Sequence, residues 1–338
     1  MNSTNEHIMV TVRCRTYNHE NYIRDCLEGF VMQKTKFRFE VLVHDDASTD
    51  KTASIVKEYA EKYPNIIVPI LEKENQYSKH DGTIERIFLS MSHGKYIAAC
   101  EGDDCWTDPL KLQKQVDFLE AHPDYTMVCN RTQLYSEKVH KAIGENYCYN
   151  QSQPVDVRDV ICRGGMFIST CSIIYRANLK DNYPDYCRKC KVGDFPLQIM
   201  AAMKGNIYYF NDMMSVYRTD NPMSWMGGLG WTEENYEKRI SAIRSVVSML
   251  KGFSTDYPQY SNYFKNRIAH HINLFIPNRK KSKKIRTQFY EEFKDEFKSF
   301  SFLWKLDAIV GFSKLPLLIR IRKLYYPRIS KKIYLYSK

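Results

Sequence analysis

The chain has 338 residues, of which 43% are hydrophobic, so it can bury a sizeable core in one large domain or two. Its net charge of +11 is uneven: residues 1–230 carry 27 Lys/Arg against 30 Asp/Glu, a net of −3, whereas residues 231–338 carry 23 against 9, a net of +14. This distribution excludes a generally basic character for the first two-thirds and confines the basic excess to the last third.

The N-terminus and the cysteines indicate the cellular compartment in which the protein is expected. The first residues lack both the basic and the apolar segment of a secretory signal, and no stretch holds 18 uninterrupted apolar residues. The ten cysteines are dispersed, and the single CxxC pair, Cys187 and Cys190, has no second pair at zinc spacing, so its role stays open. We therefore expect a protein of the reducing cytoplasm without a transmembrane helix.

Strands and helices alternate over the first hundred residues. Apolar, β-rich runs predict strands, and apolar residues at helical spacing predict the helices between them. The expected strands are Ile8–Cys14, Phe39–Val43, Ile66–Leu71 and Tyr96–Cys100, and the expected helices are Tyr22–Gln33, a helix through Ile55, Val56 and Tyr59, and Thr83–Met91. Ser48 or Asp50 is expected to cap the second helix. This order predicts an α/β fold with a mostly parallel sheet and helices on both faces.

Two of these strands end in acidic residues. Asp45 and Asp46 follow the second strand, and Glu101, Asp103 and Asp104 follow the fourth. Parallel order places both endings at one edge, where open α/β sheets bind ligands. Three carboxylates within four residues repel one another unless a cation or hydrogen bonds neutralise them, and hard divalent cations prefer oxygen ligands. We interpret the two clusters as one site, with two unrelated acidic surface turns as the alternative.

The middle of the chain is less regular. A helix is expected over residues 110–119, and short strands are expected at Met127–Val128 and Ser172–Tyr175. Between these strands, Gly164 and Gly165 indicate a loop whose backbone approaches something closely. A ligand and a packed neighbour are equally compatible with that pattern.

Asp194 begins a run with helical spacing, because Leu197, Ile199, Met200 and Met203 recur as on one face of a helix. One interpretation makes Asp194 the N-cap of that helix, a frequent structural use of aspartate. The other makes it a carboxylate presented to a cleft at the start of the helix. The residues alone leave both open.

The last third begins with a loop and continues as helices. After a strand at Met214–Arg218, residues 221–231 hold three glycines and the tryptophans Trp225 and Trp231, which is typical of a mobile flap with flat apolar faces or of a packed loop. Helices are expected from about residue 233 onward. After residue 300, apolar and aromatic residues alternate with Lys and Arg, a pattern of interfacial helices on anionic membranes. Nucleic acid would also attract this charge. The sequence holds no recognised nucleic-acid-binding motif, so we expect no nucleic acid to bind.

An ordered series of motifs resembles family 2 glycosyltransferases with the GT-A fold. The matching stretches are Thr16-Tyr17-Asn18, residues 45–52, Glu101-Gly102-Asp103-Asp104, residues 106–112, Gly193-Asp194 and Tyr217-Arg218. The resemblance covers about residues 8–230, and it implies transfer of a sugar from a nucleotide-sugar donor with inversion at the anomeric carbon. The remaining third matches nothing in the shared pattern.

For the nucleoside of the donor, the resemblance implies a site after the first two strands. Thr16, Tyr17 and Asn18 would bind the donor, with Tyr17 against the nucleobase, and Asp46 would accept a ring N–H of a uracil-like base. Arg15 departs from the proline or small residue that usually precedes Thr-Tyr-Asn in the family.

For the diphosphate, the resemblance implies a divalent metal, Mn²⁺ or Mg²⁺. Asp104 would ligate it, and Asp103 would lie near the ribose or the metal. Glu101 stands where aspartate is more frequent, so it would either bind the metal through water or only support the turn.

For catalysis, the resemblance implies that Asp194 is the base that takes a proton from the acceptor hydroxyl. One displacement inverts the anomeric carbon, so one base suffices. Trp106, Trp225 and Arg218 are expected to serve the acceptor or a lid.

These expectations combine into one hypothesis. Residues 1–230 are expected to form a GT-A catalytic domain for a nucleotide-sugar donor, with a UDP-sugar as the expected donor, and residues 231–338 are expected to form a basic helical region that associates with an anionic membrane. The enzyme would act on a glycan or lipid-linked acceptor in cell-surface polysaccharide synthesis, as a peripheral protein on the cytoplasmic face of the membrane. The alternative is a non-catalytic nucleotide-binding module whose basic tail docks on nucleic acid or a partner.

Overall fold

The computed structural model describes residues 7–79, 81–219, 232, 234–277 and 283–300. These residues group into two compact units. The first comprises Met1–Val155, Phe167–Asp181 and Met200–Ser224, and the second comprises Asp156–Met166, Asn182–Ile199 and Trp225–Lys338, each as far as it is described. The second unit thus includes two short segments from within the first 230 residues. The functional division into domains at residue 230 stays a prediction.

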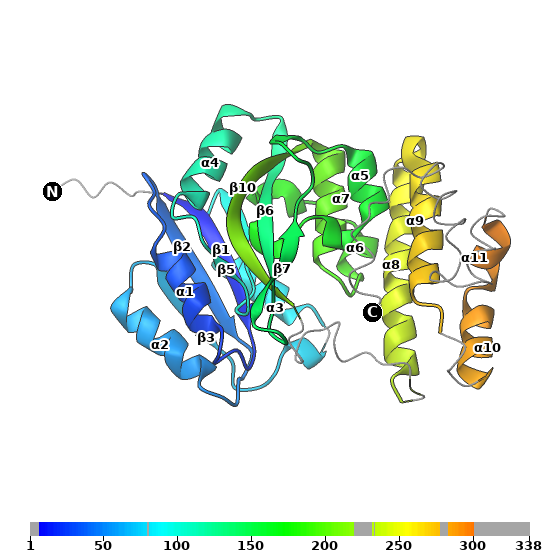
Figure 1. Cartoon of the computed structure of the whole chain (residues 1–338), viewed down its shortest axis with the longest axis horizontal. Helices are drawn as coiled ribbons and strands as arrows, with labels where there is room; N and C mark the ends of the chain where they lie inside the picture. The colour runs from blue at the N-terminus through cyan, green and yellow to red at the C-terminus, as the bar shows by residue number, and fades with distance from the viewer. Residues whose placement is uncertain (1–6, 80, 220–231, 233, 278–282, 301–338) are drawn as a thin grey trace. The chain divides into compact units, whose positions relative to one another are not determined.

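The first unit is built on one sheet of ten strands (Figure 1). The strands are β1 (Ile8–Thr16), β2 (Arg38–Asp45), β3 (Ile67–Leu71), β4 (Tyr96–Ala99), β5 (Cys105–Trp106), β6 (Tyr125–Ser136), β7 (Lys141–Asn146), β8 (Gln153–Pro154), β9 (Ile174–Arg176) and β10 (Asn206–Thr219). Their order is β3-β2-β1-β4-β9-β6-β10-β5, with β7 paired to β6 and β8 paired to β10.

Helices separate and follow these strands. They are α1 (Ile23–Val31), α2 (Thr52–Lys62), α3 (Thr83–Met91), α4 (Lys111–Ala121), α5 (Val157–Arg163), α6 (Asp185–Arg188), α7 (Asp194–Lys204), α8 (Tyr236–Asp256), α9 (Ser261–Leu274), α10 (Lys283–Glu292) and α11 (Lys294–Ser299). The expected strand and helix order of the first hundred residues is therefore confirmed.

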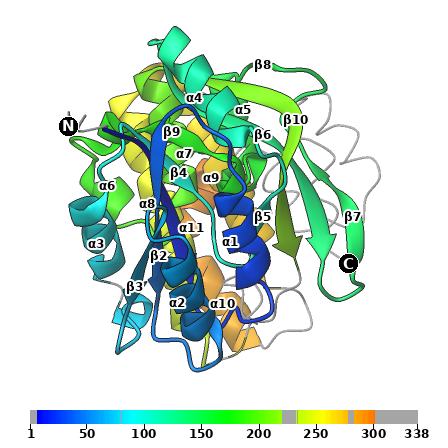
Figure 2. The same cartoon turned by 90° about the vertical axis from the view of Figure 1, so that its left-hand side faces the viewer.

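The predicted parallel pairing is also confirmed, with additions. β3, β2, β1 and β4 pair in parallel, and so do β6 and β10. β9 is antiparallel to both of its neighbours, and β5 is antiparallel to β10. The strand expected at Met127–Val128 is much longer, because β6 continues to Ser136 with polar residues alternating along it, and it pairs with the exposed β7 (Figure 2).

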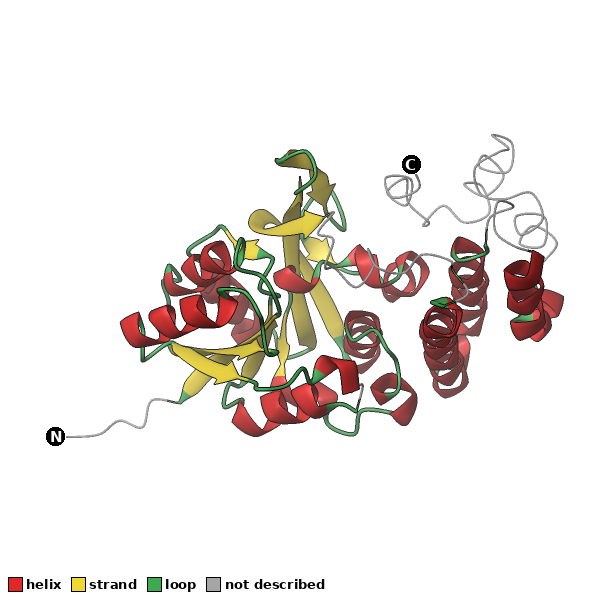
Figure 3. Ribbon diagram, turned by 90° about the horizontal axis from the view of Figure 1, so that it is seen from below, coloured by secondary structure: helices red, strands yellow, loops and turns green. Residues whose placement is uncertain are grey.

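Helices cover both faces of this sheet, as expected (Figure 3). On one face, apolar side chains of β1, β2 and β4 form a core with residues of α1, α2 and α4, among them Leu27, Val56 and Leu112. On the other face, Ile84 and Phe88 of α3 pack on Leu42 of β2. This second face also buries polar side chains, which apolar runs in the sequence do not predict.

The predicted cap of α2 is partly wrong. Ser48 does not cap the helix, because its hydroxyl donates to Asp45 Oδ1 at 2.5 Å. Asp50 Oδ1 accepts the N–H of Thr52, the first residue of α2, at 2.9 Å. The N-cap residue is Lys51, which makes no side-chain cap, so Asp50 accepts the first N–H of α2 from one position before the N-cap.

The second unit is helical. α8 and α9 bury a shared apolar stripe in which the rings of Phe253 and Phe264 stack with centroids 5.9 Å apart. Among the described residues, no helix is both long and apolar enough to cross a membrane. Trp225 and the basic apolar tail, residues 301–338, lie outside the described residues.

Candidate functional site

The carboxyl ends of the parallel strands meet at one edge of the first unit. Thr16 pairs with Asp45, and Asp45 pairs with Leu71. Arg13 pairs with Ala99, so the chain after β4 leaves the sheet beside the end of β1. We call the loops that follow β1, β2 and β4 at this edge, namely residues 17–20, 46–51 and 100–104, the acidic edge.

Hydrogen bonds join the first two loops of the acidic edge. Asn18 has a φ of 54°, and its N–H donates to Ser48 Oγ at 2.9 Å. Its Oδ1 accepts the N–H of Thr49 at 2.8 Å, and the N–H of Glu20 donates to Asp50 Oδ2 at 3.0 Å. Asn18 thus has a structural task in addition to the donor contact predicted for it, whereas Tyr17 remains 36% exposed at the rim.

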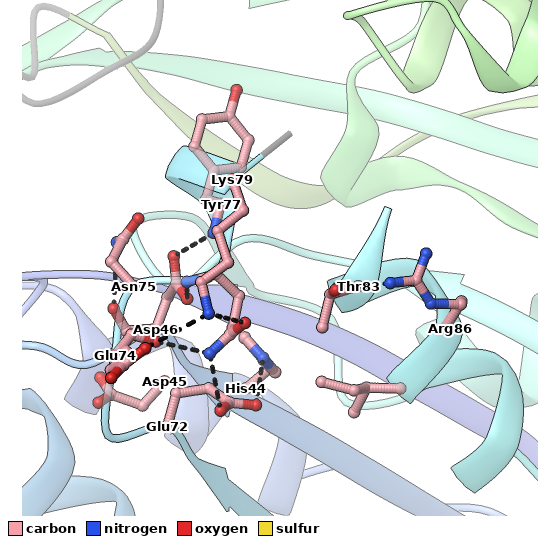
Figure 4. Close-up of polar contacts among 12 residues, drawn as sticks. His44, Asp45, Asp46, Glu72, Glu74, Asn75, Tyr77, Lys79, Thr83 and Arg86 are labelled. Carbon is pink, nitrogen blue, oxygen red and sulfur yellow. Dashed lines mark hydrogen bonds and ion pairs between the residues drawn. The ribbon is translucent and has the colours of Figure 1, made fainter. Parts of the chain in front are cut away.

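Asp46 is buried beneath a segment that follows β3. Its two carboxylate oxygens accept the backbone N–H groups of Gln76 and Tyr77 at 2.6 and 3.0 Å (Figure 4). Asn75 Nδ2 donates to the Asp46 carbonyl at 3.2 Å. The sequence reasoning missed this segment, although a polar run directly after a parallel strand is the signal that places it at the ligand-binding edge.

The acidic loop after β4 lies tightly against β1. The N–H of Gly102 donates to the Arg15 carbonyl at 2.8 Å. A Cβ at position 102 would come within 2.6 Å of Thr16 Oγ1 and 2.9 Å of His19 Nδ1. Only glycine fits between these side chains, so the glycine of this motif sets the position of the carboxylates on either side of it.

Asp104 is the most deeply buried carboxylate of this loop, at 1% exposure. Its Oδ1 accepts the N–H of Arg218 at 2.9 Å, while its Oδ2 has no hydrogen-bond partner among the described residues. Burial, together with the charge of Asp103, raises the pKa of Asp104 well above its usual range. A buried carboxylate with one oxygen left over is suited to a cation.

Protein side chains alone do not complete a metal site here. No group of three or more His, Cys, Asp and Glu side chains in the described part of the chain has metal-binding geometry. A cation at Asp104 would therefore need ligands from a bound substrate, such as phosphate oxygens. Glu101 is exposed. It lies close enough to Tyr77 that its charge, after burial, raises the pKa of that phenol.

His19 is a second residue that the sequence reasoning missed. Its Nε2 lies 4.0 Å from Asp103 Oδ2. Burial lowers the pKa of His19, although the charge of Asp103 opposes that shift. A histidine two residues after the Tyr of the first loop carries no signal of its own, because a lone polar residue in a turn is more often structural.

Arg218, at the end of β10, braces the acidic loop. Its Nη1 donates to the Asp103 carbonyl at 2.8 Å, and its Nη2 donates to Asp25 Oδ2 at 2.6 Å. Its Nε lies 3.0 Å from Glu137 Oε1. All three guanidinium nitrogens are engaged within the first unit, so the role toward an acceptor or lid stays a prediction.

The prediction that Trp106 serves the acceptor or a lid is wrong. The side chain is 2% exposed and lies in the core, where its Nε1–H donates to the Cys171 carbonyl at 2.8 Å. Its ring packs edge-on against Phe30 at 4.8 Å and under the Lys111 ammonium at 4.5 Å. An indole enclosed in this way anchors β5 and offers no surface to an acceptor.

Asp194 lies in the second unit, beside the two glycines that follow α5. It is the first residue of α7, and its Oδ1 accepts the N–H of Phe195 at 2.8 Å. An N-cap would serve a later N–H of the helix, so this geometry is not that of an N-cap. A Cβ at Gly165 would lie 3.1 Å from Asp194 Oδ2, and Gln198 Nε2 donates to the Gly165 carbonyl at 2.9 Å. We call Gly164, Gly165 and Asp194, the residue predicted to be the base, the base turn.

The environment of Asp194 alters its acidity. Burial raises the pKa of Asp194, and the hydrogen bond from Phe195 limits the shift. The two glycines thus approach packed neighbours, which was one of the two possibilities left open for them. Elsewhere in this unit, burial raises the pKa of Cys187 to about 12 and that of Cys190 to about 11, so both thiols stay protonated near neutral pH.

The family model described as Glycosyl transferase family 2 matches residues 14–183. An uncharacterised protein of Mycobacterium tuberculosis is 38% identical over 236 residues, which are 70% of this chain and 66% of that protein. The chain thus spans just under two thirds of the length of this relative.

Solved structures agree in fold. TarS of Staphylococcus aureus, a poly(ribitol-phosphate) beta-N-acetylglucosaminyltransferase, is 33% identical over 108 residues, which are 32% of this chain and 18% of TarS. Its residues 1–349 in complex with UDP-GlcNAc give a TM-score of 0.62 at 20% identity, covering 95% of this chain and 89% of that one. The mannosyltransferase PcManGT of Pyrobaculum calidifontis, in complex with GDP-Man and Mn²⁺, gives 0.52 at 16% identity, covering 96% and 83%. The shared fold is GT-A.

Proposed function

Because the chain belongs to glycosyl transferase family 2, we propose that it is an inverting glycosyltransferase. The proposed donor is a nucleotide-diphosphate sugar with uridine as its nucleoside. The proposed acceptor is a hydroxyl of a glycan or lipid-linked glycan in cell-surface polysaccharide synthesis. The observation that carries the proposal is the buried Asp104 carboxylate at the acidic edge, whose Oδ2 has no partner among the described residues.

The nucleoside would bind between Tyr17 and Asp46. Tyr17 exposes 36% of its surface, which leaves its ring available for stacking. Asp46 uses one lone-pair site on each oxygen for Gln76 and Tyr77, and a carboxylate offers about four such sites, so it can still accept a ring N–H. Thr16 and Asn18 would complete the donor contacts from the same loop.

The diphosphate would bind with a divalent cation held by Asp104, with Asp103 as its companion. The buried Oδ2 of Asp104 fits this use, because a cation offsets the cost of burying a carboxylate. Mn²⁺ or Mg²⁺, when bound, would neutralise negative charge that develops on the leaving diphosphate. Glu101 would bind this ion through water or support the turn.

Asp194 would act as the general base. Its raised pKa moves the carboxylate toward the pH at which a base removes a hydroxyl proton efficiently. The acceptor oxygen would form the new bond to the anomeric carbon as the bond to the diphosphate breaks, and the proton would pass to Asp194. A positioned base of this kind is worth about 100- to 10,000-fold in rate.

Residues 231–338 would hold the enzyme at the cytoplasmic face of an anionic membrane, because the basic excess of the chain lies there. Sedimentation with phosphatidylglycerol vesicles tests this part. Binding that survives removal of residues 301–338 would contradict it.

A nucleotide-sugar panel tests the whole proposal. The protein is heated with UDP, UDP-GlcNAc and GDP-mannose, each with and without Mn²⁺, and release of nucleoside diphosphate is followed. We expect Mn²⁺-dependent stabilisation by a uridine nucleotide, of about 3 kcal/mol at a hundredfold excess over Kd.

Two variants separate binding from catalysis. Asp104→Asn should lose the Mn²⁺-dependent stabilisation, whereas Asp194→Asn should keep it and lose nucleotide release. Stabilisation without any release by the wild-type protein, with water or lipid-linked glycans as acceptor, would instead indicate a non-catalytic nucleotide-binding module.

A further inference from the structure

The base turn contacts α9, a helix far beyond the segment that matches the family model. α9 packs against α5 within the second unit, and Gly164 ends α5 with a φ of 76°. A Cβ at Gly164 would overlap the guanidinium of Arg267, a residue of α9 that is only 8% exposed. The turn can therefore adopt its path only because position 164 has no side chain.

Arg267 contacts the chain on both sides of the base turn. Its Nη1 donates to the Cys162 carbonyl, in the last turn of α5, at 3.4 Å. Its guanidinium carbon lies 5.4 Å from the centre of the Phe195 ring, and Phe195 directly follows Asp194. One planar cation thus joins the end of α5 to the start of α7.

The end of α5 and the start of α7 also contact each other directly, without Arg267 between them. Gln198 of α7 donates to the Gly165 carbonyl at 2.9 Å, and Gly165 faces the Asp194 carboxylate so closely that a Cβ there would lie 3.1 Å from Oδ2. Any shift of the Gly164–Gly165 backbone is therefore transmitted to the carboxylate. Arg267 is the buried cation that fixes this backbone from the α9 side.

We propose that Arg267 is a positioning residue for the Asp194 carboxylate, so that the C-terminal helices form a working part of the catalytic base. The inference rests on the proposed function, in which Asp194 is that base. Arg267 acts through the turn: its contacts run to Cys162, Gly164 and Phe195. A displacement of a reacting group by about 1 Å can cost about 100-fold in rate, which sets the scale of the expected effect.

Steady-state release of nucleoside diphosphate tests the inference in the full-length protein. The substrate is the nucleotide-sugar of the panel that gives the largest Mn²⁺-dependent stabilisation, with water as acceptor. Arg267→Gln should lower kcat about 10- to 100-fold and leave the KM for the donor unchanged, because the proposed donor contacts lie in the first unit. Arg267→Lys should not restore kcat, since an ammonium lacks the planar fork that spans a carbonyl and a ring face.

Lys265→Gln is the matched control, because it removes a cation from an exposed position of the same helix. It should keep wild-type kcat and KM. Unfolding in urea is measured for each variant, so that loss of folded protein is not mistaken for loss of turnover.

A double-mutant cycle keeps the inference testable if Arg267→Gln is unstable. Gly165→Ala pushes on Asp194 from the other side, and its effect on kcat should be non-additive with that of Arg267→Lys, since both displace one carboxylate. Additive effects, or wild-type kcat in both Arg267 variants, would overturn the inference alone. No nucleotide release by the wild-type protein would overturn the proposed function and this inference with it.

Discussion

The acidic edge and the base turn present their carboxylates in different ways. At the acidic edge, Asp104 follows a buried strand within one continuous motif, and its Oδ1 is held directly by the N–H of Arg218. At the base turn, Asp194 lies against a glycine pair that is 29 residues earlier in the chain, and its distant arginine, Arg267, contacts the turn around it. Each carboxylate accepts a backbone N–H, but Asp104 receives it from another strand, whereas Asp194 receives it from the next residue in the chain. We therefore expect the placement of Asp194 to depend more on the segments packed around it.

This difference predicts how sensitive each of the two carboxylates is to substitutions around it. Few atoms hold the acidic edge in place, so single substitutions there should change both the stability of the fold and the proposed metal binding. Indirect contact spreads the placement of Asp194 over α5, α7 and α9, and each contact contributes a part. Three substitutions in the first unit test how rigidly the acidic edge is built, in order of expected effect.

Arg218→Met should have the largest effect. It leaves the Asp103 carbonyl and Glu137, whose side chain is only 16% exposed, without the guanidinium that contacts them. Removing one partner of a buried pair costs about 3 kcal/mol of unfolding free energy. Urea unfolding measures this loss, and the Mn²⁺-dependent thermal shift should weaken with it.

Arg131→Met is the control for that substitution. Arg131 also lies on a strand of the sheet, but its ion pair with Glu145 is partly exposed, so its loss should cost no more than about 1 kcal/mol. Equal losses of unfolding free energy in the two variants would show that Arg218 stabilises the acidic edge no more than a partly exposed ion pair does.

Gly102→Ala should have the next largest effect. The added Cβ would lie 2.6 to 2.9 Å from Thr16 and His19, so the loop must shift, at a cost of about 2 kcal/mol. Gly193→Ala is the matched control beside Asp194, because nothing lies within 4 Å of a Cβ added there. Urea unfolding should separate the two variants, and similar stabilities would contradict the close packing described for the acidic loop.

The sequence allowed most of the first unit to be predicted, for a physical reason. A strand that ends in acids is a local pattern, and parallel order then brings Asp46 and Asp104 to one edge without any knowledge of side-chain contacts. The antiparallel β9 was not predictable in the same way, because its three residues carry no sign of which neighbours they pair with.

What sequence reasoning missed are contacts between distant segments. Gln76 and Tyr77 cover Asp46 through backbone N–H groups, which leave no trace in residue type. Trp106 was misplaced because an aromatic residue beside an acidic motif suggests a ligand platform, whereas its N–H finds a partner in the core. Arg267 is one of many Lys and Arg residues in a basic region, and only the fold distinguishes it from the exposed ones.

Lys111, the first residue of α4, allows the smallest of these effects to be measured, beside the Trp106 side chain of β5. It is fully buried beside Trp106, its Nζ donates to Gln115 Oε1 at 2.6 Å, and burial lowers the pKa of Lys111 to about 8. The unfolded chain keeps this lysine protonated up to its ordinary pKa of 10.5, so between about pH 8 and about pH 10.5 the unfolded state binds more protons. The charge of Lys111 therefore destabilises the fold below that window, and the stability of the fold rises with pH through it.

Relative to Lys111→Met, which has no charge to lose, the wild-type protein should gain about 1 kcal/mol of unfolding free energy between about pH 8 and about pH 9, as measured by urea unfolding under reducing conditions. Lys114→Met, which removes a partly exposed ammonium from the same helix, should show no such pH-dependent difference in that interval. A difference between wild type and Lys111→Met that stays constant with pH would mean that Lys111 is solvated, and the anchoring of β5 would then depend on Trp106 alone.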